Sequence, residues 1–291
     1  MRCVKFLVAA GAAALLSSAA LAADMPSIMP PPQYYAPPAD FGGWYLRGDI
    51  GFSNQQVKNV RNTNDALYAP LLSLNQQTGF DSGGIFGLGV GYQVNNWFRA
   101  DVTGQYRGKA NFKGTDLISF PVGGVIANGI DNYSASKSEL LFLANAYVDL
   151  GTWWCVTPFI GAGVGASRVT ISNFTDTGAV NMLFDPRFTP PVVRGTFPGY
   201  ASAPSASKWN LAWALHTGLA YKVTPGLTLE FAYSYVNLGQ GVTGVVSDFT
   251  GFNTNHVMSF KDITSHDLTL GVRWELDNPP VYAPPPLISK G

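Results

Sequence analysis

The stretch that decides the fold is KWNLAWALHTGLAYK, residues 208–222. Apolar side chains such as Trp209 and Leu211 occupy one set of alternate positions. Polar side chains such as Lys208 and Lys222 occupy the other set. Successive side chains of a β-strand point to opposite faces, so this alternation predicts a strand with one oily face and one polar face.

Seven further stretches alternate in the same way, each about as long as a tilted strand that crosses a bilayer. They are residues 44–52, 85–94, 98–107, 139–150, 158–167, 227–235 and 265–276. The links between the eight stretches are alternately short and long, and the long ones cover roughly 54–82, 108–136, 168–206 and 240–264. Tight turns at one end and long loops at the other predict an all-β fold, a closed antiparallel up-and-down transmembrane barrel of eight strands. The third long link could hide another hairpin, which would make ten strands.

Charged side chains within these stretches fall only on the polar face, and we expect that face to line the barrel interior. Eight strands enclose room for side chains only, so acids and bases would pair across a plugged lumen without an open pore. The expected lumen network comprises Arg47, Asp49, Arg99, Asp101, Glu139, Glu230, Asp267 and Arg273. A soluble ligand-binding barrel would reverse the two faces, with the apolar side chains packed inside.

Two features favour the membrane barrel over the soluble one. The charged face is rich in glycine in 85–94 and 158–167, which lets a narrow barrel close around long side chains. The apolar face carries aromatic residues, many near strand ends, where a girdle would meet the lipid headgroups. The expected girdle comprises Trp44, Tyr92, Tyr106, Trp209, Tyr221, Tyr235 and Trp274.

The segments that flank the barrel have a different composition. A basic start, a short apolar run and an Ala-Leu-Ala end predict a cleaved export signal over 1–22. Residues 23–42 read as a proline-rich periplasmic linker, 43–276 as the outer-membrane barrel and 277–291 as a second proline-rich tail. Cleavage would leave Cys155 as one cysteine in the mature chain, either as a buried or lipid-facing thiol or paired between chains.

The composition excludes some functions. Charged residues make up only 12% of the 291 residues and the formal net charge is zero. A nucleic-acid partner is therefore not expected, because the chain has no basic surplus to neutralise phosphates. No phosphate-binding loop or paired Cys/His metal spacing is present, and we expect neither a catalytic nor a metal site.

Several motifs resemble one bacterial family. They are ALAAD (20–24), GWYLRGDIG (43–51), PFIGAGVG (158–165) and LGVRW (270–274). Together they resemble the small outer-membrane surface proteins of alphaproteobacteria, the OmpA-like eight-stranded barrels of rhizobia, brucellae and bartonellae. The resemblance implies a structural surface protein of the Gram-negative outer membrane, which contributes to envelope integrity and contacts host or environmental ligands through four long mobile loops. Its implied partners are outer-membrane lipid, lipopolysaccharide and the barrel-assembly machinery. Such barrels usually end on an aromatic residue, whereas Trp274 here is followed by a tail.

Three alternative functions stay open. Some relatives in this family are described as haemin-binding, and haem would need His or Tyr ligands from among His216, His256, His266 and the tyrosines. A narrow porin is the second alternative. An outer-membrane enzyme is the third, and its candidate residues gather near the last long link: His256, Ser259, Asp262, Ser265, His266 and Asp267.

Overall fold

The computed structural model describes residues 42–122, 125–185 and 192–276. The predicted export signal, nearly all of the predicted linker and the predicted C-terminal tail lie outside the described residues. Within the described part, the structure has no helix long and apolar enough to cross a membrane.

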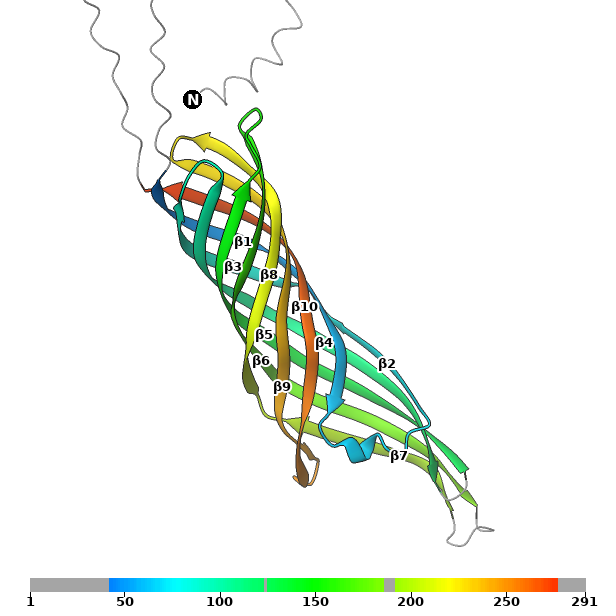
Figure 1. The fold of residues 1–291 in the computed structure, drawn as a ribbon. Helices are drawn as coiled ribbons and strands as arrows, with labels where there is room; N and C mark the ends of the chain where they lie inside the picture. Colours follow the sequence, from blue (N-terminus) through cyan, green and yellow to red (C-terminus); the bar gives the residue numbers. More distant parts are fainter. Residues whose placement is uncertain (1–41, 123–124, 186–191, 277–291) are drawn as a thin grey trace, which may run out of the picture.

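Eight strands form a closed antiparallel ring, which confirms the predicted fold class (Figure 1). In ring order they are β1 (Gly43–Asn62), β3 (Gly83–Gln93), β4 (Phe98–Val122), β5 (Val125–Asp149), β6 (Val156–Asp185), β8 (Ala206–Thr224), β9 (Leu227–Asp248) and β10 (Asn253–Glu275). The ring closes where β1 pairs with β10, from Tyr45 opposite Glu275 to Asn62 opposite Met258. Closure satisfies the backbone hydrogen bonds within the ring, which hydrocarbon cannot do.

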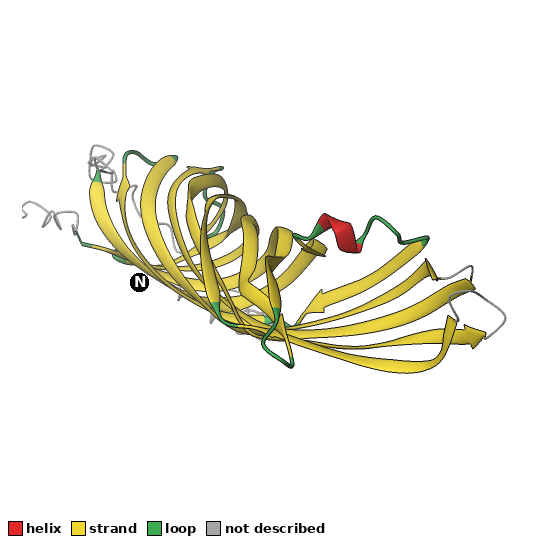
Figure 2. Cartoon of the chain, turned by 90° about the horizontal axis from the view of Figure 1, so that it is seen from below, coloured by secondary structure: helices red, strands yellow, loops and turns green. Residues whose placement is uncertain are grey.

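Two further strands lie outside this ring. β2 (Ser73–Phe80) pairs with the distal part of β4, and β7 (Val192–Ala203) pairs with the distal part of β6. Together with the distal parts of β4, β5 and β6 they build one curved, open sheet that continues from the ring (Figure 2). We call this the extracellular sheet and define it as β2, β7 and residues 110–122, 125–137 and 172–185. It lies at the end opposite the tight turns, which is the outer end of such a barrel. The third long link does contain a hairpin, formed by the distal part of β6 and by β7, but this hairpin does not widen the eight-stranded ring.

The prediction that the four long links are loops is wrong for much of their described length, which is paired strand. Residues 108–122 and 125–136 are strand, and the link 240–264 reduces to a four-residue tip, 249–252, between β9 and β10. The short 3-10 helix η1 (Asp65–Leu67) lies in the first link, before β2. Alternation of polarity fades outside the membrane, because water contacts both faces there. The backbone nevertheless continues to pair, through bulges between Arg107 and Ala110 and between Ser134 and Ser136.

The turn between β5 and β6 has an uncommon conformation. Trp153 and Val156 exchange both backbone hydrogen bonds at 2.9 Å, which leaves a two-residue hairpin loop. Its residues Trp154 and Cys155 have φ angles of 49° and 69°, as such a loop requires of both positions. Cys155 is half-buried in this loop, and the alternatives expected for its side chain stay predictions.

Candidate functional site

The inner half of the lumen holds a cluster of paired charges. Arg47 on β1 donates to Asp49 at 2.9 Å and to Asp101 on β4 at 2.8 Å. The same guanidinium donates to the hydroxyl of Tyr147 on β5 at 2.9 Å. Tyr45 in turn donates to Asp101 at 3.1 Å. One arginine therefore joins three strands across the interior.

Glu230 on β9 is shared by three arginines. Its carboxylate lies 3.1 Å from Arg99, 3.5 Å from Arg273 and 3.7 Å from Arg47. Arg99 is fully buried, and its guanidinium carbon also lies 4.3 Å from the ring centre of Tyr147. Because a buried charge without a counter-ion is costly, this carboxylate holds the arginines of three strands together.

Two further ion pairs lie toward the outer half of the lumen. Arg107 on β4 makes a two-point contact with Asp267 on β10, with one N–O distance of 3.1 Å. Lys137 and Glu139, both on β5, pair with each other, and Gln55 contacts both. All eight residues expected in the lumen network therefore lie inside the ring, and each makes an ion pair.

Glycine provides the room for this network. A Cβ on Gly91 would collide with the ring of Tyr45, and one on Gly161 would collide with the ring of Tyr147. Both tyrosines are buried inside the ring, where they contact Asp101 and Arg47. The rings of these tyrosines fill the space beside the glycines. The glycine-rich face of β3 and β6 is therefore the face that points into the ring.

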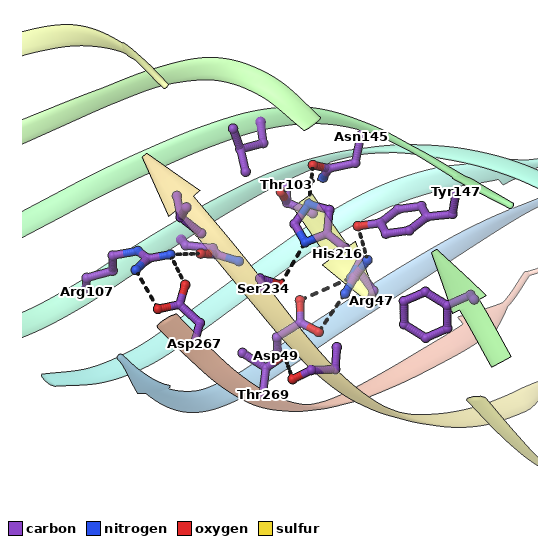
Figure 3. A pocket seen from close by; sticks show the side chains of 15 residues that line it. Arg47, Asp49, Thr103, Arg107, Asn145, Tyr147, His216, Ser234, Asp267 and Thr269 are labelled. Carbon is purple, nitrogen blue, oxygen red and sulfur yellow. Dashed lines mark hydrogen bonds and ion pairs between the residues drawn. The ribbon is translucent and has the colours of Figure 1, made fainter. Parts of the chain in front are cut away.

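Little free space is left in this part of the lumen. A cavity of about 20 Å³, near the volume that one water molecule occupies, is lined by charged and polar groups from six strands (Figure 3). His216 spans part of it, with one ring nitrogen 2.7 Å from the Ser234 hydroxyl and the other 3.2 Å from the Asn145 side-chain oxygen. The described lumen thus resembles a hydrogen-bonded core more than a channel.

Apolar side chains fill the interior toward the extracellular sheet, which the sequence analysis did not anticipate. The rings of Phe112 on β4 and Phe260 on β10 meet edge to face at 4.9 Å. Leu141 and Leu143 on β5 are buried in the same apolar cluster. These two leucines were visible as apolar exceptions on a polar face, and the exceptions were the signal of an apolar plug.

The expected girdle residues alternate with the inward residues of their strands and therefore point away from the ring. Trp44, Tyr92 and Trp274 lie on neighbouring positions at the inner end, where the Trp44 and Tyr92 ring centres are 5.4 Å apart. The chain advances 12 residues along β8 from Trp209 to Tyr221. At about 3.3 Å per residue and a tilt of about 40°, this is about 30 Å along the membrane normal. That distance matches the hydrocarbon thickness of a bilayer.

A lipid-facing apolar belt, a paired-charge lumen and a closed ring together define an outer-membrane barrel. The profile of the outer membrane protein beta-barrel domain family matches residues 8–275. The chain belongs to this family. It is a β-barrel protein of the Gram-negative outer membrane, and the resemblance to alphaproteobacterial surface proteins is confirmed.

Relatives of the chain come from several bacteria. An uncharacterised protein of Brucella abortus is 31% identical over 222 residues, which cover 70% of this chain and 71% of that protein. A putative adhesin of Rickettsia bellii is 28% identical over 82% of this chain and 91% of that protein. The outer membrane protein PagN of Salmonella typhimurium is 26% identical over 80% of this chain and 89% of that protein.

Two solved structures of outer-membrane proteins are also similar. Neisserial surface protein A matches with 16% identity and a TM-score of 0.40, over 80% of this chain and 97% of that structure. The protein OprG of Pseudomonas aeruginosa matches with 12% identity and a TM-score of 0.42, over 81% of this chain and 97% of that structure.

The candidate enzyme residues do not gather at one place. Ser265 and Asp267 point into the lumen and contact each other. His266, between them in sequence, points outward, with a ring nitrogen 2.7 Å from the hydroxyl of Tyr233. His256 contacts only the Thr63 hydroxyl, at 3.4 Å, among the side chains that the structure describes. No group of acidic, histidine or cysteine side chains in the described ranges is spaced to hold a metal ion.

Sequence reasoning missed some members of the lumen network. Lys137 lies just outside the predicted strand 139–150, although it is two residues before Glu139 and therefore on the same face of the continuing strand. Asp149, the second partner of Arg99 at 3.3 Å, was on the charged face but outside the expected set. Extending the alternation N-terminal to residue 139 would have found Lys137, whereas Asp149 already lies on the charged face of the predicted strand 139–150.

Proposed function

We propose that this protein is a surface-attachment protein, in which a sealed barrel anchors the extracellular sheet outside the cell. The observation that carries the proposal is strand length. β4 and β5 have 25 residues each and β6 has 30, where about ten cross the hydrocarbon. The surplus residues pair with β2 and β7 into a sheet that the membrane anchor does not need.

The interior supports an anchoring role over transport. Buried ion pairs and an apolar plug occupy the described lumen in series, and the cavity near His216 measures about 20 Å³. A solute would have to break paired charges to pass, and breaking a buried pair costs about 3–5 kcal/mol. We expect no large stable conductance in planar bilayers, and an open pore of stable size would favour the porin alternative.

The names of relatives point the same way. The Rickettsia bellii relatives are named putative adhesins, and they align with most of this chain. We also propose that the barrel supports envelope integrity, because its closed, ion-paired ring is a rigid body that spans the outer membrane. A catalytic role finds no support in the scattered positions of His256, Ser265 and His266.

A truncation tests the proposal directly. Ala110 is paired with Lys137, and Ile171 is paired with Ala206, so an Asn-Gly turn can replace 111–136 and another can replace 172–205 without cutting the ring. A non-adherent Gram-negative strain that displays the native protein should attach to cultured host cells. The same strain with the truncated barrel should attach in numbers at least about tenfold lower. Replacement of the tip 249–252 by Asn-Gly is the matched control. Equal attachment by a correctly folded truncated barrel would contradict the proposal.

Haemin binding stays a prediction without a favoured site. The three histidines lie in three different surroundings: the lumen, the outer rim and the lipid-facing side. Haemin titration of the refolded barrel, with His256 and His266 replaced in a second sample, decides the question. The absence of a shift in the Soret band of haemin would contradict the haemin-binding prediction.

A further inference from the structure

Three carboxylates share the inner face of the extracellular sheet. Asp116 on β4 lies directly opposite Asp131 on β5, and Asp176 on β6 lies opposite Tyr133, the next inward residue of β5. The Asp131 side chain occupies the space over Gly178, where a Cβ would collide with it. We call Asp116, Asp131 and Asp176 the acidic triad. Like charges that face each other across paired strands destabilise a sheet, so this arrangement needs a reason.

Asp116 has one oxygen without a partner. Its side chain is almost fully buried, with 3% of the residue exposed. One carboxylate oxygen accepts from the Tyr133 hydroxyl at 3.1 Å and from the Gln76 amide at 3.2 Å. The other oxygen, Oδ1, is buried and has no hydrogen-bond partner in the described structure. A buried carboxylate oxygen left unsatisfied is costly unless something outside the chain completes it.

Within the described residues, no basic side chain forms an ion pair with the triad. Among the ion pairs of the described residues, every acid of the lumen network has an arginine or lysine, whereas none of the three triad acids has one. Burial, reinforced by Asp131 and Asp116, raises the pKa of Asp176 to about 7. Burial also raises the pKa of Asp131 and of Asp116. Negative charge in this part of the sheet therefore lacks compensation.

We propose that the acidic triad binds a cationic side chain, the guanidinium or ammonium group of a basic polypeptide outside the cell. The inference rests on the proposed function and names the partner class of the same sheet. Asp131 and Asp176 are half-buried and so reachable from solvent. A guanidinium can donate to the carboxylates of Asp131 and Asp176 at once, and its positive charge also offsets the negative charge of buried Asp116. The ring of Tyr133, stacked on Phe174 at 6.1 Å, adds an aromatic wall.

The chemistry of the site favours an organic cation over a bare metal ion. No cluster of acidic side chains in the described residues has the spacing of a metal site. The partners already present on Asp116, a phenol hydroxyl and an amide, are neutral hydrogen-bond donors, and both bind the same oxygen. Planar donors of a guanidinium span such separated acceptors better than a single ion does.

The test uses the full barrel in lipid nanodiscs and a defined probe, acetyl-tetraarginine amide, titrated at pH 8. Asp131→Asn with Asp176→Asn should weaken binding about 100-fold, since each charged hydrogen bond contributes about tenfold. The matched control, Asp65→Asn with Asp262→Asn, removes two exposed extracellular acids and should change the affinity by less than about twofold. Native-like affinity in the triad variant would overturn the proposal, and so would calcium chloride that competes fully with the peptide.

A second variant guards against a folding artefact. Asp131→Lys places an ammonium group next to Asp116 from within the chain, so the sheet should fold and the peptide should no longer bind. A folded Asp131→Lys barrel that binds the peptide as the native one does would also overturn the proposal. Folding is checked by the gel-mobility shift on heating.

The attachment assay separates this inference from the proposed function. Loss of attachment in both the sheet truncation and the triad variant supports both. If the truncation abolishes attachment while Asp131→Asn with Asp176→Asn does not, the surface-attachment role stands and the triad inference falls. If the truncation leaves attachment intact, the proposed function is refuted. Peptide binding to the protein in nanodiscs then still tests whether the acidic triad binds a cationic side chain.

Discussion

Replacement of Asp267 by asparagine should destabilise the barrel strongly while keeping the shape of the side chain. Asp267 is 2% exposed and makes a two-point contact with Arg107, which is 1% exposed. The remaining partner of the guanidinium in the described structure is the neutral Gln105 side chain, at 3.2 Å. The substitution therefore leaves a buried cation without its counter-ion.

The expected loss is about 3–5 kcal/mol of unfolding free energy. A unit charge pair about 4 Å apart attracts by about 4 kcal/mol at an effective dielectric constant near 20, and removal of one partner from a buried pair costs about 3–5 kcal/mol. Removal of both charges, as Arg107→Met with Asp267→Leu, should cost less than about 1 kcal/mol or even stabilise the barrel, because neither desolvated ion remains.

The assay is urea unfolding of the barrel in lipid micelles, followed by tryptophan fluorescence. Arg168→Met is the matched control, since Arg168 is exposed on the outer face and contacts the Ser207 hydroxyl at 3.4 Å. It should change the unfolding free energy by less than about 1 kcal/mol. If Asp267→Asn costs no more than this control, the charged face is not sealed, and the reasoning fails.

Further predictions concern the plug, the lipid face and the pH response. Phe260→Ala should cost about 3–5 kcal/mol in the same unfolding assay, because the ring is fully buried against Phe112; a cost under 1 kcal/mol would mean the plug is loose. Phe231→Arg should reduce the yield of heat-modifiable barrel, because a charge at mid-membrane costs about 2–4 kcal/mol; an unchanged yield would contradict a lipid-facing β9. Burial raises the pKa of Asp176 to about 7 in the folded sheet, whereas an unfolded chain would release this proton near pH 4. Folding is therefore favoured at pH 5, where the folded carboxyl is protonated, and loses stability as the pH rises through 7. The extracellular sheet should therefore exchange its amide hydrogens more slowly at pH 5 than at pH 8, after correction for intrinsic rates, and Asp176→Asn should remove the difference.

The membrane-spanning part of the fold could be predicted from the sequence because lipid imposes a strict rule. Each strand there has one hydrocarbon face, so Leu211 and Lys208 cannot exchange sides without a large cost. Outside the bilayer that rule ends. Water tolerates either face of the sheet around 110–122 and 125–137, and glycine and asparagine in these ranges resemble loop residues although the strands there are paired.

The sequence predicts which charged residues line the lumen, but not which of them form ion pairs with each other. Parity places Arg47 and Glu230 on the inward face, yet which arginine reaches which acid depends on the register of strands far apart in the chain. The acidic triad left no sequence signal, since Asp116 and Asp176 are 60 residues apart and meet only because β4, β5 and β6 pair beyond the ring. Long-range register of this kind cannot be read from composition or alternation.

The central claim is that apolar side chains face the acyl chains while the charged ones are sealed inside the ring. Neighbouring residues of β9 test it most directly, because Phe231 points outward and Glu230 points into the lumen. The measurement is nuclear magnetic resonance of isotope-labelled protein in bilayers whose lipids carry a spin label at mid-chain. The spin label should strongly increase the relaxation rate of the Phe231 ring signals and only weakly increase that of the Glu230 side-chain signals. Strong relaxation of Glu230 with protection of Phe231 would contradict the account and turn the barrel inside out.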